Sequence, residues 1–500
     1  MSTKKEYGDF QTPLSLARRV AALVERRENR IGTIIEPTCG IGTFLQAAVE
    51  RFGGSPIYWG FDVNAEYVEA AKAALARVAP STATVQQRDF YTTNWEQFLA
   101  EQAGPLLIIG NPPWITNAGM AVIGGSNLPA KSNFQRRNGL DAKTGKANFD
   151  ISEWMIVRLL QALQGSRAAI AMLCKTATAR KVLRHAWLNG LGLGQSTLHL
   201  IDAATEFGVS VDACLLYMHT GIEESESMAT VYRSLSFAEP LRTFGLSAGE
   251  LVSDVEAYRE LRDLDGLEHR KWRSGVKHDA AQVMEFTRDN GSFVNGLGER
   301  YKLEDDYMFP LLKSSDLAND RLRPTRFVLL TQLRVGDTTE KIRSTAPKTW
   351  QYLLEHADKL DKRGSSVYKN RARFSIFGVG NYSFSPAKVA ISGLYKNLQF
   401  QAIGGSGGKP IVVDDTCYFI PCASKQEAEF FAELLNSETA QRFVSALVFK
   451  DAKRPVTIDI LKRVDLRRLA ERAGRKMEAL EYLSSSTPGC GQQHLLFAEE

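Results

Sequence analysis

One short stretch of the sequence, Asn111-Pro112-Pro113-Trp114, places an amide, two prolines and an aromatic ring directly after the apolar run 106–110. A proline lacks a backbone donor and fixes its own φ, so a proline pair cannot continue a sheet ladder. We therefore expect the chain to leave a buried strand here with a rigid backbone that holds the Asn111 amide and the Trp114 ring at the sheet edge. A strand-ending turn with a tryptophan in the core is the alternative.

Three other predicted strand ends carry groups that suit a nucleoside. The first leads into Glu36-Pro37-Thr38-Cys39-Gly40-Ile41-Gly42, whose glycines permit a tight turn close to a ligand. Asp62, twenty residues past Gly42, offers a carboxylate to ribose hydroxyls. Asp89 and Phe90 offer an acceptor and a ring to an adenine. No lysine follows the glycines and no third glycine stands at dinucleotide spacing, so S-adenosylmethionine fits better than ATP or NAD.

The elements that position these residues alternate between helix and strand, which predicts an α/β domain with a parallel sheet covered on both faces. Apolar spacing predicts helices over 13–27, 42–52, 65–78 and 152–164, and strands over 33–37, 57–63, 83–90, 105–111, 167–174 and 212–220. We expect this domain to span residues 1–245. A helical connector (246–270), a mixed α+β domain (271–475) and a loose tail (476–500) follow.

Composition narrows the class of protein and its partners. No apolar run is long enough for a membrane span, and the N-terminus lacks the apolar core of a signal peptide, so we expect a cytoplasmic protein. Six scattered cysteines predict reduced thiols and no structural metal. Residues 261–475 hold 36 Lys and Arg against 27 Asp and Glu, whereas the rest of the chain holds 26 against 30. This asymmetry favours a polyanionic partner for the later half, with a solvated basic face as the alternative.

An ordered series of motifs now becomes recognisable: EYGDFQTP (6–13), EPTCGIGTF (36–44), GFDVN (60–64), RDF (88–90), NPPW (111–114) and FGVSVDACLLYM (207–218). The series resembles the adenine-specific (N6) DNA methyltransferases, and its order resembles the gamma class found in restriction-modification systems. The resemblance covers roughly residues 6–220 and is thinner beyond. It implies a Rossmann-like class I S-adenosylmethionine-dependent methyltransferase domain followed by a mixed α+β target-recognition domain.

The resemblance also assigns roles to residues. It implies a catalytic tetrapeptide, Asn111, Pro112, Pro113 and Trp114. The residues that it places at the cofactor are Tyr7, Phe10, Thr12, Pro13, Glu36, Pro37, Thr38, Gly40, Gly42, Asp62, Asp89, Phe90 and Asn111. The Asn111 side-chain oxygen and the Pro112 carbonyl would accept the two hydrogens of the adenine amine, which turns the nitrogen lone pair toward the methyl group. The base must first be flipped out of the duplex, and Trp114 can stack on it.

Double-stranded DNA is the expected partner, and Lys396, Lys409 and Arg454 are candidates for phosphate contacts because they stand beside Gly, Asn or Pro. A restriction endonuclease that acts separately and a monomeric enzyme are further expectations. Two rival functions stay open: methylation of cytosine N4, which poses the same chemical problem, and a DNA-binding modification subunit that needs partners. Asn rather than Ser at position 111 favours adenine modestly.

Several other residues have plainer interpretations. Cys422, after Pro421, stands far outside the order expected of a cytosine-C5 nucleophile, and Cys39 is a small residue in the turn. His278 with Asp279 has no third ligand at metal spacing and suits a structural or DNA-facing role. The run at 404–409, GGSGGK, predicts a flexible loop. Asp150 and Trp154 are expected to line the cleft that Tyr7, Phe10 and Pro13 would cover at the methionine end of the cofactor.

Overall fold

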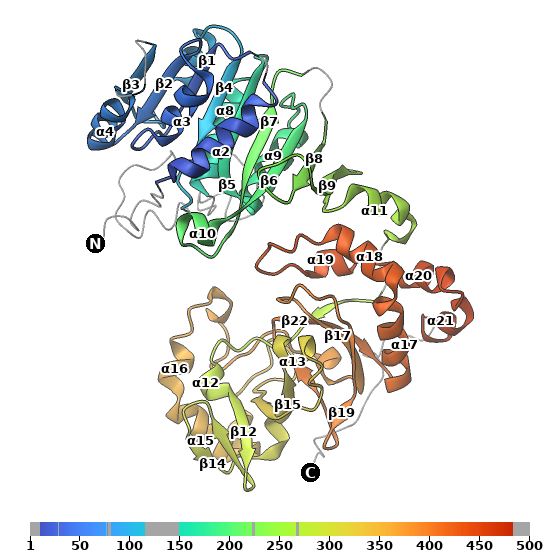
Figure 1. The fold of residues 1–500 in the computed structure, drawn as a ribbon. Helices are drawn as coiled ribbons and strands as arrows, with labels where there is room; N and C mark the ends of the chain where they lie inside the picture. Colours follow the sequence, from blue (N-terminus) through green and yellow to red (C-terminus); the bar gives the residue numbers. More distant parts are fainter. Residues whose placement is uncertain are drawn as a thin grey trace. The chain divides into compact units, whose positions relative to one another are not determined.

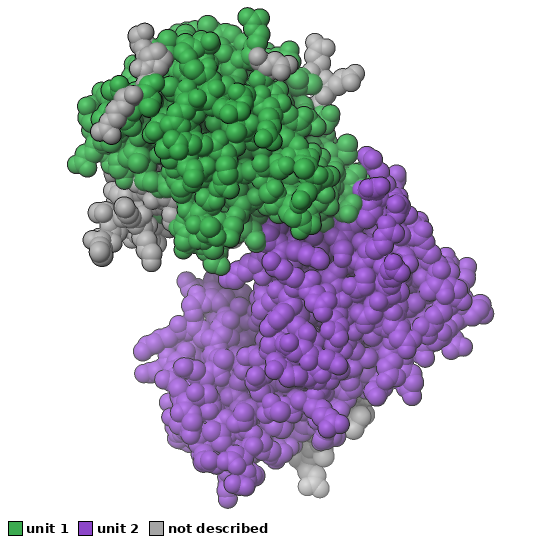
Figure 2. Space-filling model, in the orientation of Figure 1, with its two compact units in different colours: residues 1–255 green, residues 256–500 purple. Residues whose placement is uncertain are grey.

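The computed structural model describes residues 11–28, 30–76, 78, 82–115, 150–222, 226–266 and 270–483. The chain divides into two compact units, residues 1–255 and residues 256–500 (Figure 2). Each unit has its own sheets and its own hydrophobic core. In the described residues, the helices lack the length and apolar character that crossing a bilayer requires.

Unit 1 is built on one sheet with the strand order β10-β9-β8-β6-β7-β5-β4-β1-β2-β3 (Figure 1). The five strands that carry the candidate site, β5-β4-β1-β2-β3, pair in parallel, and β7 runs antiparallel between β5 and β6. The strands are β1 Thr33–Glu36, β2 Ile57–Asp62, β3 Ala83–Gln87, β4 Leu106–Gly110, β5 Ala168–Lys175, β6 Ser196–Asp202, β7 Asp212–His219, β8 Met228–Tyr232, β9 Pro240–Ser247 and β10 Glu250–Val252.

Helices cover both faces of this sheet. Side chains of α2, α3 and α4 share one core with Ile34, Leu107 and Ile109. On the opposite face, α5 packs Phe98 against Phe61 at a ring distance of 5.1 Å. The helices are α2 Leu14–Glu25, α3 Thr43–Phe52, α4 Ala65–Leu75, α5 Trp95–Ala100, α8 Ile151–Ala162, α9 Thr176–Leu188 and α10 Ala203–Phe207. The prediction of a parallel sheet between helical layers is confirmed.

Local sequence explains where the helices begin. Asn64 accepts a hydrogen bond from Glu66 N at the start of α4, and Asp150 accepts one from Ser152 N at the start of α8. A side-chain acceptor at this position satisfies one of the donors that a helix leaves open at its first turn. In α2, apolar residues recur at helical spacing, and six of them are buried: Leu16, Ala17, Val20, Ala21, Leu23 and Val24. Capping and periodicity therefore place these helices where the sequence predicts them.

The stretch 246–270 differs from the continuous helix expected there. It holds the end of β9, strand β10, helix α11 Val255–Glu260 and a 3-10 turn, Arg262–Leu264. Ala248 and Gly249 have positive φ of 51° and 82°, so they form the tight turn that joins β9 to β10. The charged helical spacing after residue 254 is real, but it supports only the six residues of α11.

Unit 2 contains two larger sheets, with the orders β11-β22-β17-β18 and β14-β13-β12-β16-β15-β21, and a small hairpin β19-β20. Its strands are β11 Arg273–Ser274, β12 Glu285–Asp289, β13 Ser292–Asn295, β14 Arg300–Tyr301, β15 Met308–Leu312, β16 Arg326–Leu329, β17 Ala387–Ser392, β18 Gln401–Ile403, β19 Gly405–Ser406, β20 Lys409–Pro410, β21 Val412–Val413 and β22 Cys417–Cys422. The GGSGGK run, expected as a flexible loop, is this hairpin: Gly407 and Gly408 take the positive φ of its turn.

Short helices complete unit 2: α12 Ala281–Met284, α13 Ser314–Ala318, α14 Ile342–Thr345, α15 Pro347–Glu355, α16 Ala357–Asp361, α17 Lys425–Asn436, α18 Glu438–Leu447, α19 Ile458–Leu461, α20 Leu466–Arg472 and α21 Lys476–Leu483. Helix α17 packs on β17 and β18. The mixed α+β character expected of this half is therefore present. The first part of the expected tail, residues 476–483, is helix α21, and residues 484–500 lie outside the described residues.

Candidate active site

The four marked strand ends lie side by side because their strands are neighbours in the order β4-β1-β2-β3 and all run in parallel. Glu36 ends β1, Asp62 ends β2, Asp89 follows β3 and Asn111 follows β4. Parallel strands bring their carboxyl ends to one edge of the sheet, which is where ligands bind in open α/β folds. The structure therefore brings together the residues that the sequence marked separately.

The glycine turn after β1 is held by Asp62. Gly40 N donates to Asp62 Oδ2 at 2.9 Å, and Asn64 N donates to Asp62 Oδ1 at 2.8 Å. Gly40 and Gly42 have φ of 51° and 82°, and a Cβ added at Gly40 would lie 2.7 Å from Gln11 Oε1. The turn thus keeps its surface clear of side-chain bulk at a carboxylate that can accept from a ribose diol. Residues 37–43 include no lysine or arginine, so the set fits an S-adenosylmethionine nucleoside rather than a phosphate.

Glu36 has a structural contact as well as a place at the edge. Its side chain is only 2% exposed, and its Oε2 accepts from Leu45 N at 3.2 Å in the first turn of α3. Burial, with a smaller contribution from the negative charge of Asp62, raises the pKa of the Glu36 carboxyl well above its usual range. Glu36 therefore joins β1 to α3, and its direct contact with the cofactor stays a prediction.

Aromatic rings gather beside Asp89. Asp89 Oδ1 accepts from Tyr91 N at 2.8 Å, and the Phe90 ring packs against Trp95 and Trp154 at ring distances of 4.9 and 6.0 Å. Tyr91 also meets Trp154, at 5.3 Å. The sequence marked Asp89, Phe90 and Trp154 but not Tyr91, which stands directly after the motif RDF (88–90). Phe90 itself is buried, so its part in stacking on a cofactor adenine stays a prediction.

The tetrapeptide follows β4 without a break. Asn111 Nδ2 donates to Thr12 Oγ1 at 3.2 Å, which joins the Asn111 amide to the segment before α2. The Trp114 ring is 6% exposed; its Nε1 donates to Leu173 O at 3.4 Å, and the ring meets Phe207 edge to face at 5.1 Å. The Trp114 ring, expected at the sheet edge, is covered by β5 and α10 and belongs to the hydrophobic core, as in the alternative interpretation of the tetrapeptide.

A lysine that the sequence reasoning missed holds the end of this loop. Lys175 Nζ donates to Trp114 O at 2.8 Å and to Asp150 Oδ2 at 2.7 Å. Ile151 N donates to Ile115 O at 2.9 Å, so the end of the tetrapeptide and the residue after it are tied to β5 and α8. Asp150, which was loosely expected at the cleft, lies beside it and is buried. The one signal for Lys175 was its position directly after the apolar run of β5.

The other predicted residues fall into three groups. Tyr7 and Phe10 lie outside the described residues. Pro37 and Thr38 belong to the turn after β1, and Pro13 directly precedes α2. Gly42 packs closely on α4, since a Cβ there would lie 2.9 Å from Ala71 Cβ. The buried Cys422 lies inside β22, and His278 contacts Glu285 at 3.4 Å, which agrees with a structural role.

The three candidates for DNA contact differ in what they touch. Lys409 Nζ donates to the carbonyls of Asp305 and Met308, the latter at 3.0 Å, and its side chain is 20% exposed. It therefore fastens β20 to β15. Arg454 pairs with Asp415 at 3.6 Å and is more exposed, and Lys396 is exposed on the loop after β17. The structure thus gives Lys409 a structural contact that its place beside a glycine did not suggest.

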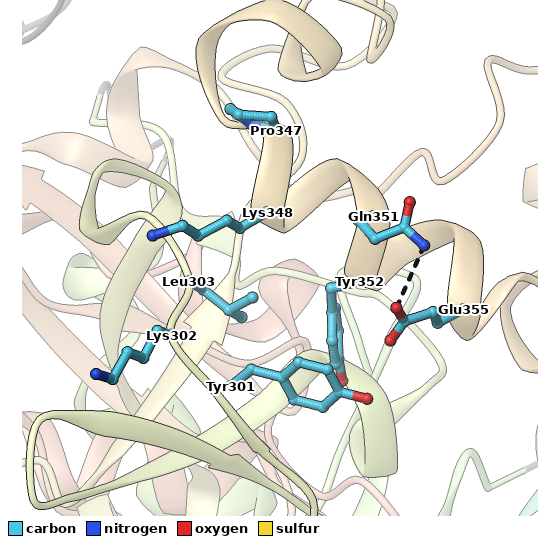
Figure 3. A pocket seen from close by; sticks show the side chains of 8 residues that line it. All are labelled: Tyr301, Lys302, Leu303, Pro347, Lys348, Gln351, Tyr352 and Glu355. Atoms are coloured by element: carbon cyan, nitrogen blue, oxygen red, sulfur yellow. Dashed lines mark hydrogen bonds between the residues drawn. The ribbon is translucent and has the colours of Figure 1, made fainter.

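A surface pocket of about 440 Å³ lies in unit 2 (Figure 3). Its walls come from β14 with the residues after it and from α15: Tyr301, Lys302, Leu303, Pro347, Lys348, Gln351, Tyr352 and Glu355. The base of this pocket is fixed by Tyr352, whose hydroxyl donates to Val283 O at 2.7 Å. The pocket includes none of the residues at the strand ends of unit 1.

Comparisons with known proteins agree with this geometry. No family model matches the chain. A type II methyltransferase, M.NspV of Nostoc sp. (strain ATCC 29411 / PCC 7524), is 43% identical over 471 residues, which cover 94% of this chain and 98% of that protein. The type IIL restriction-modification enzyme MmeI, solved in complex with DNA, aligns over 90% of this chain with a TM-score of 0.55 at 13% identity. This chain spans 64% of the length of MmeI.

A methyltransferase subunit of a type I restriction-modification system from Streptococcus thermophilus aligns over 46% of this chain and 48% of that one, with a TM-score of 0.34 at 13% identity. The fold of unit 1 is the Rossmann-like fold of methyltransferases that use S-adenosylmethionine, as the sequence predicts. With near-complete coverage at 43% identity, the chain belongs to the type II methyltransferases of restriction-modification systems, and its cofactor is S-adenosylmethionine.

Proposed function

We propose that this enzyme methylates the N6 amine of a target adenine within a specific sequence of double-stranded DNA. The observation that carries the proposal is the position of Asn111 and Pro112. They stand directly after β4, which pairs with β1, and therefore beside the glycine turn and Asp62. An amide and a carbonyl are thus fixed next to the place where the cofactor residues gather.

The chemistry follows from what those two groups can accept. The adenine N6 is a poor nucleophile because its lone pair is conjugated with the ring. When Asn111 Oδ1 and Pro112 O accept its two hydrogens, the nitrogen can become tetrahedral and point its lone pair out of the ring plane. Bound S-adenosylmethionine supplies an electrophilic methyl group: the amine lone pair forms the new N–C bond, the S–C electron pair stays on sulfur, and one amine proton leaves to water.

The target base has to leave the duplex before these groups can reach it, at a cost of a few kcal/mol. Stacking on an aromatic ring contributes about 1–3 kcal/mol in the opposite direction. Trp114 is the proposed partner. The Trp114 ring is buried against Phe207. The base would therefore contact the part of the Trp114 ring that Phe207 does not cover, or the neighbouring side chains would move.

Unit 2 is proposed to bind and read the DNA. MmeI, which has a similar fold over 90% of this chain, was solved in complex with DNA. The loops after β17 and before β22 meet in unit 2, since Gly393 N donates to Thr416 O at 2.8 Å. The loop of Arg454 joins them through Asp415, which also faces Lys277 at 3.9 Å. Lys396 and Arg454 therefore lie on neighbouring loops, and we propose both as phosphate contacts.

The experiment that tests the proposal is long-read sequencing of DNA from a methylation-free host that expresses this chain. The expected result is N6-methyladenine within one recurring sequence, which is absent from a host that expresses Asn111→Ala. N4-methylcytosine in the same assay would redirect the proposal to cytosine, because that amine poses the same chemical problem. Unmodified DNA from a host with soluble enzyme would favour a subunit that needs partners. We also propose that this enzyme is a monomer and that its cognate restriction endonuclease acts separately.

A further inference from the structure

Two adjacent residues before α2 contact the two halves of the active site. Thr12 Oγ1 accepts from Asn111 Nδ2 at 3.2 Å, across 99 residues of sequence. Its neighbour Gln11 accepts from Ile41 N in the glycine turn, at 3.4 Å through Oε1. The Gln11 side chain lies directly above the turn, since a Cβ at Gly40 would come within 2.7 Å of it. One short segment thus joins the cofactor turn to the catalytic amide.

The contact with Thr12 matters because the two ends of a carboxamide are opposite in function. The oxygen accepts hydrogen bonds and the nitrogen donates them. An amine about to be methylated needs an acceptor, and an amide turned by half a rotation about its last bond would offer N–H groups that repel the amine hydrogens. The rotation is soft in an isolated asparagine, because such terminal torsions are broad and roughly twofold. A contact within the protein must therefore hold the Asn111 amide in one of the two orientations.

Thr12 makes such a contact. Its side chain is 9% exposed, and it stands just before Pro13, whose fixed φ begins α2. In the structure this hydroxyl accepts from the nitrogen end of the Asn111 amide, which leaves the oxygen on the other branch. Because a threonine hydroxyl can also donate, the contact anchors the amide in this orientation and does not by itself exclude the turned one. The resemblance of the first motif block implied cofactor contacts for Thr12, whereas its hydrogen bond in the structure goes to the catalytic residue.

We infer that Thr12 is a positioning residue for methyl transfer: its hydroxyl anchors the nitrogen end of the Asn111 amide, in the orientation that presents Oδ1 to the target amine. Gln11 beside it connects that orientation to the cofactor turn. The inference rests on the proposed function, in which Asn111 accepts from the amine. It differs from a cofactor-binding role because it locates the effect of Thr12 at the methyl acceptor.

The test compares Thr12→Val, which keeps the shape but removes the hydroxyl, with Thr12→Ser, which keeps the hydroxyl. Thr243→Val in β9 is the matched control, because β5, β7, β6 and β8 separate β9 from β4 in the sheet. We expect Thr12→Val to lower the single-turnover methylation rate at saturating cofactor and DNA by about two- to tenfold, the effect of one lost hydrogen bond. The Kd for S-adenosylmethionine should stay within about twofold of wild type. Thr12→Ser should restore most of the rate, and Thr243→Val should leave it unchanged.

A second measurement separates positioning from a general loss of structure. A duplex with 2-aminopurine directly beside the target adenine keeps the N6 amine of that adenine and reports its flipping by fluorescence without requiring turnover. Because Thr12 acts through Asn111, Thr12→Val should weaken this signal in the wild-type background and have no further effect in Asn111→Ala. An equal effect in both backgrounds, or a change confined to the Kd for S-adenosylmethionine, would overturn the inference. If the wild-type enzyme makes no N6-methyladenine, the proposed function has failed instead.

Discussion

The two units of this methyltransferase place their functional side chains in different ways. In unit 1, Asp62 and Asn111 follow neighbouring strands of one sheet, and each is oriented by a hydrogen bond, from Gly40 N to Asp62 and from Asn111 to Thr12. In unit 2, the basic candidates stand on loops, where Lys409 is tied to main-chain carbonyls and Lys396 is exposed. A motif at a strand end thus predicts where a side chain lies. The position of a basic residue in a loop does not show whether its side chain faces the solvent or is held by other residues.

We expect the largest effects from substitutions of Asn111 and Pro112, which are proposed to bind the amine that accepts the methyl group. We expect Asn111→Ala to lower the single-turnover rate at least about a hundredfold, as is typical when one donor or acceptor of a preorganised site is removed. Pro112→Gly should have a similar effect because it loosens the backbone that aims the carbonyl. Tritium transfer from labelled cofactor measures the rate, and calorimetry should show a nearly unchanged Kd for S-adenosylmethionine. A variant with wild-type turnover would remove Asn111 or Pro112 from the proposed mechanism.

At the candidate cofactor site, we expect a substitution to weaken the binding of S-adenosylmethionine. Asp62→Ala removes the acceptor that holds Gly40 N and Asn64 N, and we expect S-adenosylmethionine binding to weaken by about 1–3 kcal/mol. Calorimetry across a cofactor titration measures this change, and Asp202→Ala, at the start of α10, is the matched control for losing a carboxylate that caps a turn. Unchanged affinity in Asp62→Ala would mean that the nucleoside lies elsewhere.

In unit 2, two lysines test whether contacts decide function. Lys396→Ala should weaken DNA binding about equally across sequences and lower the log-log salt slope by about one, with unchanged thermal stability. Lys409→Ala should leave the slope unchanged and destabilise the protein by about 1 kcal/mol, because carbonyls of β15 and its preceding turn lose their donor. DNA affinity over a salt series and denaturant unfolding measure both. The reverse outcome would show that exposure in this unit does not identify the phosphate contacts.

The smallest expected effect concerns Glu36. Burial raises its pKa in the folded protein above the ordinary value of 4.5, so the folded state retains a proton that the unfolded state releases. The stability from this group is complete below pH 4.5 and declines as the pH rises toward the folded pKa. Glu36→Gln keeps an acceptor for Leu45 N without the charge, so its unfolding free energy should fall less between pH 5 and pH 8. Parallel pH profiles of the two proteins would contradict this assignment.

Sequence patterns predicted the elements and the strand ends that form the candidate cofactor site, because these depend on local information. Apolar periodicity marked β1 to β5, and the glycines and Asp62 stand at fixed offsets from two of these strands. Contacts between distant segments were not predictable in this way. The burial of Trp114 depends on β5 and α10, and the role of Lys409 depends on residues 305–308. The expected connecting helix was wrong because Ala248 and Gly249 reverse the chain into a strand pair.

The tie between Lys175, Trp114 and Asp150 has a consequence for local unfolding. The hydrogen bonds that Glu36, Asp62 and Asp89 accept from Leu45 N, Gly40 N and Tyr91 N join residues no more than 22 positions apart in the sequence. The contacts that hold the tetrapeptide reach across 61 residues to Lys175 and 99 residues to Thr12. Opening of α8 and the end of β5 would therefore release Trp114 while β1, β2 and β3 stay paired. We expect native-state hydrogen exchange to show an intermediate that still binds S-adenosylmethionine but has lost the ordered methyl-acceptor loop.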